Sequence, residues 1–180
     1  MNLKKKIKVA IDSPAAAGAG TQARLIAKYY NLFYLDTGKI YRLIANLKLK
    51  NPKKFTYLYI KKKVKNLKIK DLQNKELLSD ETGIYASTIA KNKKIRNLVH
   101  NFQVKNAYHP PKKYNGSCLD GRDITYKIIP DANFKFFITA NIKTRALRRY
   151  KELKQLKKRC HHINLLEMKQ YDKRVSFWFK

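Results

Sequence analysis

A run of small residues follows the first apolar segment and has the composition of a phosphate-binding loop. Residues 7–12 are mostly apolar, and Thr21 ends the run. Small side chains let backbone N–H groups approach an anion, and the positive end of a following helix adds to them. Thr21 stands where such loops place a hydroxyl on Mg²⁺, but Ala19 stands where they carry a lysine. A plain strand–turn–helix is the alternative. The predicted loop residues are Ser13, Pro14, Ala15, Ala16, Ala17, Gly18, Ala19, Gly20 and Thr21.

Charged residues gather at three further points, each directly after a predicted strand. They lie in residues 36–42, in residues 120–123, and in a helix that carries Arg145, Arg148 and Arg149. The three arginines recur at three- and four-residue spacing, so they share one side of the helix. A planar guanidinium binds two phosphate oxygens at once, which favours an anion clamp over a solvated basic helix.

The hydrophobic pattern predicts an α/β fold that brings these points to one edge of a parallel sheet. The predicted strands are residues 6–12, 32–35, 116–119 and 134–138, and the predicted helices are residues 20–30, 41–47, 79–92, 93–108 and 142–158. A strand–loop–helix–strand beginning implies a right-handed crossover, and ligands then bind at the carboxyl edge of the strands. Residues 48–75 are rich in lysine and aromatic residues, and we interpret them as short helices with a solvated basic face and inward aromatics.

Composition argues against a membrane protein and leaves open whether the high positive charge serves a polyanion partner. The chain carries 42 Lys and Arg against 12 Asp and Glu, a formal net charge of +30. Such a charge fits a polyanion partner, but the lysines extend from Lys4 to Lys180, which favours a compositional bias over a nucleic-acid interface. Two cysteines, 44% hydrophobic residues and no long apolar run are typical of a single-domain cytoplasmic protein. We expect a monomer without a membrane partner.

Four separated stretches together resemble the bacterial cytidylate kinase family of P-loop nucleoside monophosphate kinases. Residues 11–21 resemble a degraded form of its loop, and residues 35–42 resemble its Asp-[Ser/Thr]-Gly-x-x-Tyr-Arg motif. Residues 120–132 match Asp-Gly-Arg-Asp followed by Pro-Asp-Ala, and residues 144–149 resemble Glu-Arg-Ala-x-Arg-Arg. The resemblance extends from Ile7 to about Arg174 and implies a three-layer α/β/α fold with a central parallel sheet. It implies a core (residues 1–45 and 116–142), a monophosphate-binding insert (46–115), a lid with its following helix (143–174) and an atypical tail (175–180).

The resemblance implies transfer of the γ-phosphoryl group of ATP to CMP or dCMP, with Mg²⁺. Residues 13–21 would bind ATP, and Thr21 would hold the metal ion. We hypothesise that Asp120, at a strand end near Thr21, orients Mg²⁺ through water. The catalytic residues implied are Arg122, Asp123, Arg145, Arg148 and Arg149, to which we add Lys39. The residues implied to bind CMP or dCMP are Asp36, Thr37, Gly38, Arg42, Ser87, Arg96, Gly121, Arg122, Asp123 and Arg174.

The sequence departs from the family pattern in three respects. Ala19 removes a lysine that bridges phosphates, and we hypothesise that Lys39 supplies the lost charge. Ser13 and Ala16 replace expected glycines, so we expect a reshaped loop. Residues 175–180 no longer resemble the family and carry three bulky aromatics, which indicates a truncated or frame-shifted copy with weakened activity.

Two other functions remain open at this point. One is a decayed relative that binds nucleotide or RNA without turnover, as Ala19 and the net charge of +30 allow. The other is a kinase of the same type with a different acceptor, such as another nucleoside monophosphate or shikimate. The acceptor that stimulates ADP formation distinguishes these alternatives.

Overall fold

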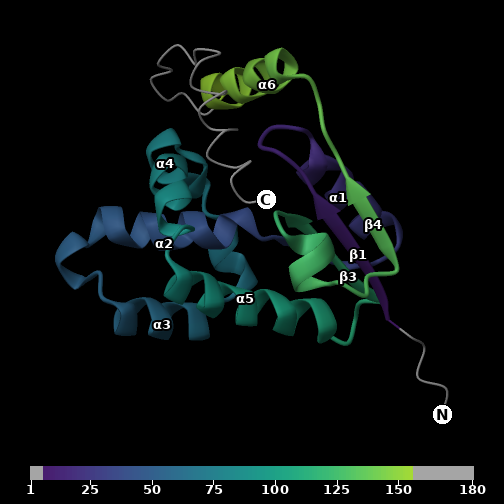
Figure 1. Ribbon diagram of the computed structural model, residues 1–180, viewed down its shortest axis with the longest axis horizontal. Helices are drawn as coiled ribbons and strands as arrows, with labels where there is room; N and C mark the ends of the chain where they lie inside the picture. Colours follow the sequence, from purple (N-terminus) through teal and green to yellow (C-terminus); the bar gives the residue numbers. More distant parts are fainter. Residues whose placement is uncertain (1–5, 156–180) are drawn as a thin grey trace.

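A parallel four-stranded sheet forms the centre of the computed structural model, which describes residues 6–155 (Figure 1). Its strands lie in the order β2 (Phe33–Asp36), β3 (Gly116–Gly121), β1 (Ile7–Asp12) and β4 (Phe134–Phe137). The four predicted strands are confirmed, although β3 extends two residues beyond the predicted Leu119. Pairing aligns Asp36 with Asp120 and Asp12 with Gly121, so the predicted polar clusters do meet at the carboxyl edge.

Helices cover both faces of the sheet because consecutive strand residues point to opposite sides. On one face, α1 (Ala19–Tyr29) packs through Ala23 and Ala27 against Val9, Ile11 and Cys118. On the other face, Ala10, Leu35 and Leu119 belong to a larger core that includes Val99 and Ala107 of α5 (Lys93–Tyr108). The predicted three-layer α/β/α architecture is therefore confirmed.

The remaining helices lie beyond the sheet on the α5 side or after β4 (Figure 1). Helix α2 (Gly38–Lys50) ends at its C-cap residue, Asn51, and Pro52 begins the next short helical turn. Ser79 caps the fourth helix by accepting a hydrogen bond from the Thr82 N–H, so this helix starts one residue later than predicted. The helices are α2 (Gly38–Lys50), α3 (Tyr57–Lys65), α4 (Asp80–Ile89) and α6 (Ile142–Gln155), with short helical turns at Pro52–Lys54, Ile69–Gln73, Lys75–Leu78 and Ile124–Ile128.

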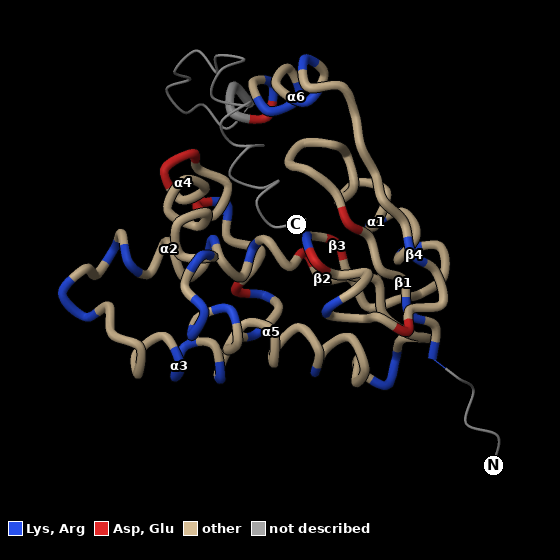
Figure 2. The backbone as a smooth tube through the Cα atoms, in the orientation of Figure 1, with Lys and Arg blue, Asp and Glu red and all other residues tan. Residues whose placement is uncertain are grey.

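Residues 48–75 fold into short helices, as interpreted from the sequence, but not all of their aromatics turn inward. Ile60 and Val64 are the buried side chains of α3, whereas Tyr57 at its first position is exposed. Apolar residues four apart lie on one helical face, and this aliphatic pair occupies it. Figure 2 shows Lys and Arg spread over most elements, α3 included. Within residues 6–155, no helix has both the length and the apolar character that crossing a bilayer requires.

Polar clamps hold the amino edge of the sheet, opposite the predicted site. Lys8 of β1 forms an ion pair with Asp131 at 2.5 Å, and its ammonium group lies 4.5 Å from the centre of the Tyr108 ring. The Asn31 and Asn115 side chains donate to backbone carbonyls of Lys113 and Tyr30, respectively. These contacts tie the start of β3 to the segment before β2. The amino edge is thus fixed by contacts between segments distant in the sequence.

Candidate functional site

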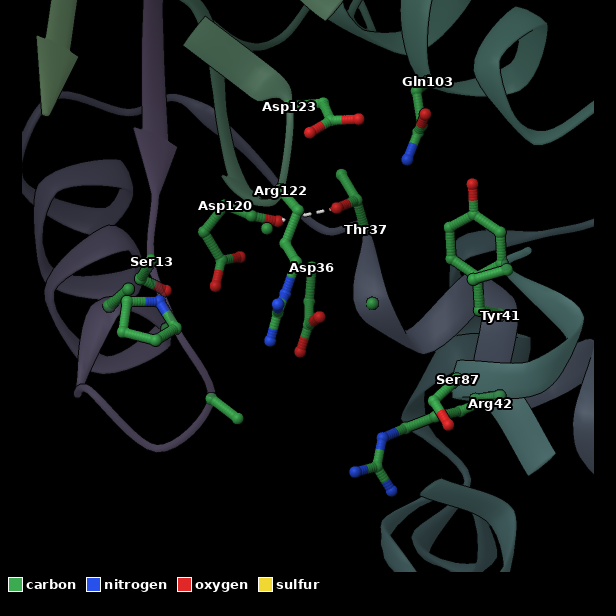
Figure 3. Close-up of a pocket in the computed structure, with 18 of the residues that line it drawn as sticks. Ser13, Asp36, Thr37, Tyr41, Arg42, Ser87, Gln103, Asp120, Arg122 and Asp123 are labelled. Carbon is green, nitrogen blue, oxygen red and sulfur yellow. Dashed lines mark hydrogen bonds between the residues drawn. The ribbon is translucent and has the colours of Figure 1, made fainter. Parts of the chain in front are cut away.

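A cavity of about 950 Å³ lies at the carboxyl edge of the sheet (Figure 3). Loop residues 13–21 form one wall, α2 and α4 another, and the segment after β3 a third. Figure 3 shows the side chains of Asp36, Asp120 and Arg122 directed into the same space. The predicted residues that line it are Ser13, Pro14, Ala15, Ala16, Ala17, Gly18, Ala19, Gly20, Thr21, Asp36, Thr37, Gly38, Arg42, Ser87, Arg96, Asp120, Gly121, Arg122 and Asp123.

The loop and the start of α1 line this cavity with backbone. Gly18 has a φ of 96°, and no side chain among the described residues caps α1. The first N–H groups of a helix have no partner within the helix, so this end of α1 suits an anion. Ala16 also has a positive φ, 58°, which costs about 1 kcal/mol or more for a residue with a Cβ. The expected reshaping therefore concerns Ala16, while Ser13 keeps a negative φ and donates its N–H to the Gly121 carbonyl at 3.1 Å.

Asp12, at the end of β1, positions the segment that follows β3. Its carboxylate accepts hydrogen bonds from the N–H groups of Ile124 and Thr125, at 2.8 and 3.0 Å, and from the Thr125 hydroxyl. The Asp12 side chain is almost completely buried. It therefore fixes the position of residues 121–125, a role that sequence reasoning did not assign to it.

Asp123 gathers cations at the cavity wall. It adopts a left-handed conformation with a φ of 61°, and its carboxylate accepts a hydrogen bond from the Tyr126 hydroxyl. Arg96 of α5 pairs with it at 2.9 Å and Lys127 at 3.3 Å. Two positive groups from different elements are thus held together at the cavity wall, which Arg122 also lines. This arrangement can bind an anion such as a phosphate.

Two carboxylates, the buried Asp120 and the half-buried Asp36, lie side by side at the ends of β3 and β2. Burial, and then the charge of Asp36, raises the pKa of Asp120 to about 7, and burial also raises the pKa of Asp36. The Oδ1 atom of Asp120 is buried without a hydrogen-bond partner among the described residues. A Cβ built on Gly20 would stand 3.3 Å from its Oδ2 atom. Paired, under-satisfied carboxylate oxygens beside a phosphate loop fit a divalent cation.

Thr37 closes the floor of the cavity. Its hydroxyl donates to the Asp120 carbonyl at 2.9 Å, and its N–H donates to the same oxygen at 3.0 Å. The Thr37 Oγ1 atom lies so close to Gly121 that a Cβ there would stand 2.0 Å from it. A glycine at position 121 is therefore required for β2 and β3 to end side by side.

Arg42 and Ser87 bring α2 and α4 to the cavity. Arg42 donates through Nη1 to the carbonyl oxygens of Leu77 and Ser79, at 2.8 and 3.1 Å, and its guanidinium packs against Gly83. Ser87, one turn further along α4, donates to the Ile84 carbonyl. The arginine expected to hold a nucleotide phosphate thus also fixes the start of α4.

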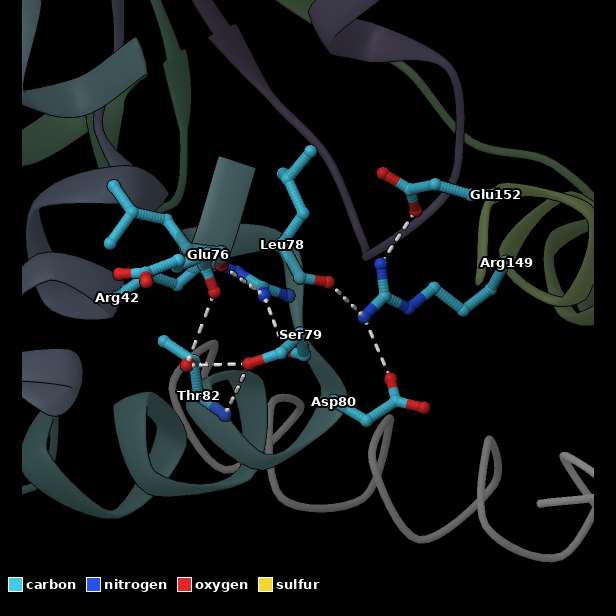
Figure 4. Close-up of polar contacts among 9 residues, drawn as sticks. Arg42, Glu76, Leu78, Ser79, Asp80, Thr82, Arg149 and Glu152 are labelled. Carbon is cyan, nitrogen blue, oxygen red and sulfur yellow. Dashed lines mark hydrogen bonds and ion pairs between the residues drawn. The ribbon is translucent and has the colours of Figure 1, made fainter. Parts of the chain in front are cut away.

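The arginines of α6 contact the loop and the insert rather than line the cavity. Arg145 and Arg148 donate to the carbonyl oxygens of Ala15 and Ala17, at 3.3 and 2.8 Å. Arg149 donates to the Leu78 carbonyl at 3.1 Å and pairs with Asp80 at 2.7 Å and Glu152 at 2.6 Å (Figure 4). Arg149 therefore ties α6 to the start of α4 across the mouth of the site.

We expect the variant Asp80→Asn to loosen this tie without unfolding the chain. A partly exposed ion pair contributes about 0.2–1 kcal/mol, which corresponds to a change of up to about fivefold in how often α6 meets α4. Steady-state kinetics should therefore give a higher KM for CMP, the acceptor that the sequence resemblance implies, and the melting temperature should fall by no more than about 2–4 °C. Glu81→Gln is the matched control, because Glu81 is exposed in the same turn of α4 and does not line the cavity. An equal effect of both variants would contradict the tie.

The structure leaves some predicted residues out of the cavity wall and adds others. Lys39 is half-buried in the first turn of α2, where its N–H donates to Asp36, and it is not among the lining residues. Arg174, the tail and the lid beyond residue 155 lie outside the described residues. Sequence reasoning missed Arg24 and Lys127, although each lies three or four residues from a predicted site residue on a helix. The lining residues not predicted include Arg24, Tyr41, His100, Gln103 and Lys127.

Comparison with known proteins gives consistent matches over most of the chain. The sequence model of the family described as Cytidylate kinase matches residues 9–176. The cytidylate kinase of Bartonella tribocorum is 42% identical over 178 residues, which cover 94% of this chain and 78% of the relative. The cytidylate kinase of Bartonella quintana is 41% identical with the same coverage, and that of Clostridium tetani is 37% identical over 90% of this chain and 74% of the relative. The matched region includes the loop, both strand-end clusters and α6.

Proposed function

The chain belongs to the cytidylate kinase family, and from this premise we propose that it transfers the γ-phosphoryl group of ATP to CMP or dCMP. The observation that carries the proposal is the single cavity lined by the phosphate loop on one side and by Arg42, Arg96 and Arg122 on the other. Phosphoryl transfer depends on positioning and charge neutralisation, so two facing anion-binding surfaces suit it. We further propose a monomer that acts in the cytoplasm.

The donor nucleotide binds at the loop in this proposal. The amide groups at the head of α1 bind its phosphates. Arg145 and Arg148 keep the carbonyl oxygens of Ala15 and Ala17 turned away from the phosphates by donating hydrogen bonds to them. A second cavity of about 470 Å³ lies between the loop, at Gly18 and Thr21, and Arg148 of α6. It offers space for the rest of the nucleotide. In this proposal α6 (Ile142–Gln155), where the predicted lid begins, lies next to this part of the site through the contacts of Arg145 and Arg148 with the loop.

Asp36, Asp120 and Thr21 are the residues that would hold Mg²⁺. Their oxygen atoms suit this cation, and the unpartnered Oδ1 atom of Asp120 supports the assignment. When bound there, the ion neutralises charge on the phosphate oxygens. The chain itself contributes two carboxylates that oxygen-binding cations favour.

The acceptor nucleotide binds against the insert, residues 46–115. Arg42, Arg96 and Arg122 supply positive charge for its phosphate, and Asp123 holds Arg96 in place. Thr37, Gly38 and Gly121 form the adjoining backbone, and Ser87 offers a hydroxyl to the base. Closure of the lid over both nucleotides excludes water, so that ATP is not hydrolysed.

An acceptor-dependent assay tests this proposal. ADP formation from ATP and Mg²⁺ should rise strongly with CMP or dCMP, with turnover of about 1–100 per second for a kinase of ordinary efficiency. AMP, UMP and shikimate serve as control acceptors in the same assay. Preference for another acceptor would replace the substrate assignment. No turnover together with salt-sensitive RNA binding would instead support the non-catalytic alternative.

A further inference from the structure

Arg24 lies where the phosphate loop lacks its usual positive side chain. The loop carries Ala19 immediately before Gly20, and Arg24 follows one helical turn after Thr21 in α1. Helical side chains lean toward the N-terminus of their helix, so a residue three positions after Thr21 covers the turn that contains Thr21. The Arg24 Nη2 atom is 3.5 Å from Thr21 Oγ1. The guanidinium thus returns to the level of the loop.

The geometry at Gly20 places Arg24 in the wall of the cavity. A Cβ built on Gly20 would stand 3.7 Å from Arg24 Nη1, 3.5 Å from the Tyr34 hydroxyl and 3.3 Å from Asp120 Oδ2. The Arg24 side chain also lies over the Tyr34 ring, with its central carbon 5.9 Å from the ring centre. It lines the large cavity together with Thr21, Asp36 and Asp120. The cation is therefore adjacent to the backbone that faces the phosphates.

We propose that Arg24 supplies the positive charge that Ala19 cannot, with its guanidinium binding phosphate oxygens of ATP at the head of α1. The proposal rests on the proposed function for the identity of the ligand. An arginine fits this place because its planar fork binds two oxygens of a phosphate at once and its charge is permanent. The Thr21 hydroxyl and the Tyr34 ring lie against the guanidinium. The negative charges of Asp36 and Asp120 attract it, so it lies near the loop before nucleotide binds.

Arg24 fits this role better than Lys39. Lys39 lies on α2, beyond Asp36, and is absent from the lining of the cavity. Arg24 belongs to the helix whose first turn forms the end of the loop, so its distance from the loop is set by one rigid element. The alternative hypothesis, that Lys39 supplies the charge, is tested in the same experiment by the variant Lys39→Ala.

The variant Arg24→Gln tests the proposal, with Lys28→Gln as the matched control. Lys28 lies one turn further along α1, is exposed, and is not a lining residue. We expect Arg24→Gln to weaken ATP binding, measured by calorimetry without acceptor, by about tenfold or more, because charge-assisted bonds to phosphate are lost. We also expect kcat to fall about 10²-fold or more, as when one electrostatic group is removed from other active sites. Lys28→Gln should keep both quantities within twofold, and neither variant should change the melting temperature.

A rescue experiment separates a role at the phosphates from a structural one. Introducing the lysine of the family pattern, Ala19→Lys, into Arg24→Gln should restore at least part of kcat and of ATP affinity. Arg24→Lys, which keeps a charge at its original place, should fall between wild type and Arg24→Gln even if the double variant does not fold. Lys39→Ala is measured in parallel.

Three results would overturn the assignment of Arg24. They are ATP affinity and kcat within twofold of wild type in Arg24→Gln, a larger loss in Lys39→Ala than in Arg24→Gln, and an Arg24→Lys variant as impaired as Arg24→Gln. The calorimetric arm remains informative if wild type binds ATP but shows no turnover with any acceptor, which would overturn the proposed function alone. A wild-type protein that binds no ATP would overturn both.

Discussion

Replacing Asp120 with asparagine should abolish most phosphoryl transfer while leaving the fold as stable as before or more stable. The carboxylate supplies oxygens expected to hold a cation beside the phosphates, and its loss should lower kcat on the order of 10³-fold. The same carboxylate is buried beside Asp36, and these two causes raise its pKa to about 7. Asparagine removes a buried charge that repels Asp36. Activity and stability should therefore change in opposite directions.

The pH dependence of stability gives this prediction a second measurement. The folded protein binds the Asp120 proton more tightly than the unfolded chain, where the pKa is about 3.9. The ionised Asp120 carboxylate therefore lowers the free energy of unfolding fully above pH 7, and this destabilisation is relieved as the pH falls below 7. Without added divalent cation, the unfolding free energy of wild type should gain on that of Asp120→Asn between pH 8 and pH 6.

An exposed carboxylate on the same protein provides the control for Asp120→Asn. Glu81 lies in the first turn of α4 and points into solvent, so Glu81→Gln should change neither kcat nor the pH dependence appreciably. A destabilised Asp120→Asn variant, or one with kcat close to wild type, would contradict the placement of two repelling carboxylates at the site.

The variant Gly121→Ala should be strongly destabilised. Its Cβ would stand 2.0 Å from Thr37 Oγ1, which real contacts do not allow, so β3 or the start of α2 must shift. Overpacking of this kind costs about 3 kcal/mol, or about 6–12 °C in melting temperature for a chain of this length. Thermal unfolding followed by circular dichroism measures it.

A second substitution shows whether the Thr37 contact causes this loss. Removing the Thr37 hydroxyl with Thr37→Ala should recover part of the stability in the double variant, so the two effects should not add. Gly38→Ala is a control for stability, because a Cβ there meets only Asp36 Oδ1 at 3.4 Å. Strict additivity of the Gly121 and Thr37 changes would contradict the steric explanation.

Much of the fold could be predicted because its signals are local. The apolar ends of β1 and β3, the small residues of the loop and the periodicity of α1 and α5 each follow from neighbouring residues. Parallel strands share a carboxyl edge, so the loop and the Asp36 and Asp120 segments had to converge. The convergence of the lining residues on one cavity followed from that topology rather than from any single motif.

The parts that could not be predicted depend on contacts between distant segments. Nothing near Asp12 in the sequence indicates that it binds the N–H groups of Ile124 and Thr125. Arg149 was expected among the catalytic residues, yet its partners Leu78 and Asp80 come from the insert. Lys39 has a suitable charge and position in the sequence, but the direction of the first turn of α2 keeps it out of the cavity wall. Side-chain direction is a tertiary property in each case.

The clamps at the amino edge of the sheet have a consequence for how the chain can evolve. These contacts of Lys8, Asp131, Tyr108 and the two asparagines secure the end of the strands opposite the candidate site. The opposite end can then accommodate two like charges in close proximity and the left-handed conformations of Ala16 and Asp123. Asn31 at the amino edge is also left-handed, but asparagine adopts this conformation at little cost. The contacts that stabilise the sheet thus lie at one end of the strands, and the candidate site lies at the other. Substitutions at the candidate site can therefore accumulate without weakening the contacts at the amino edge.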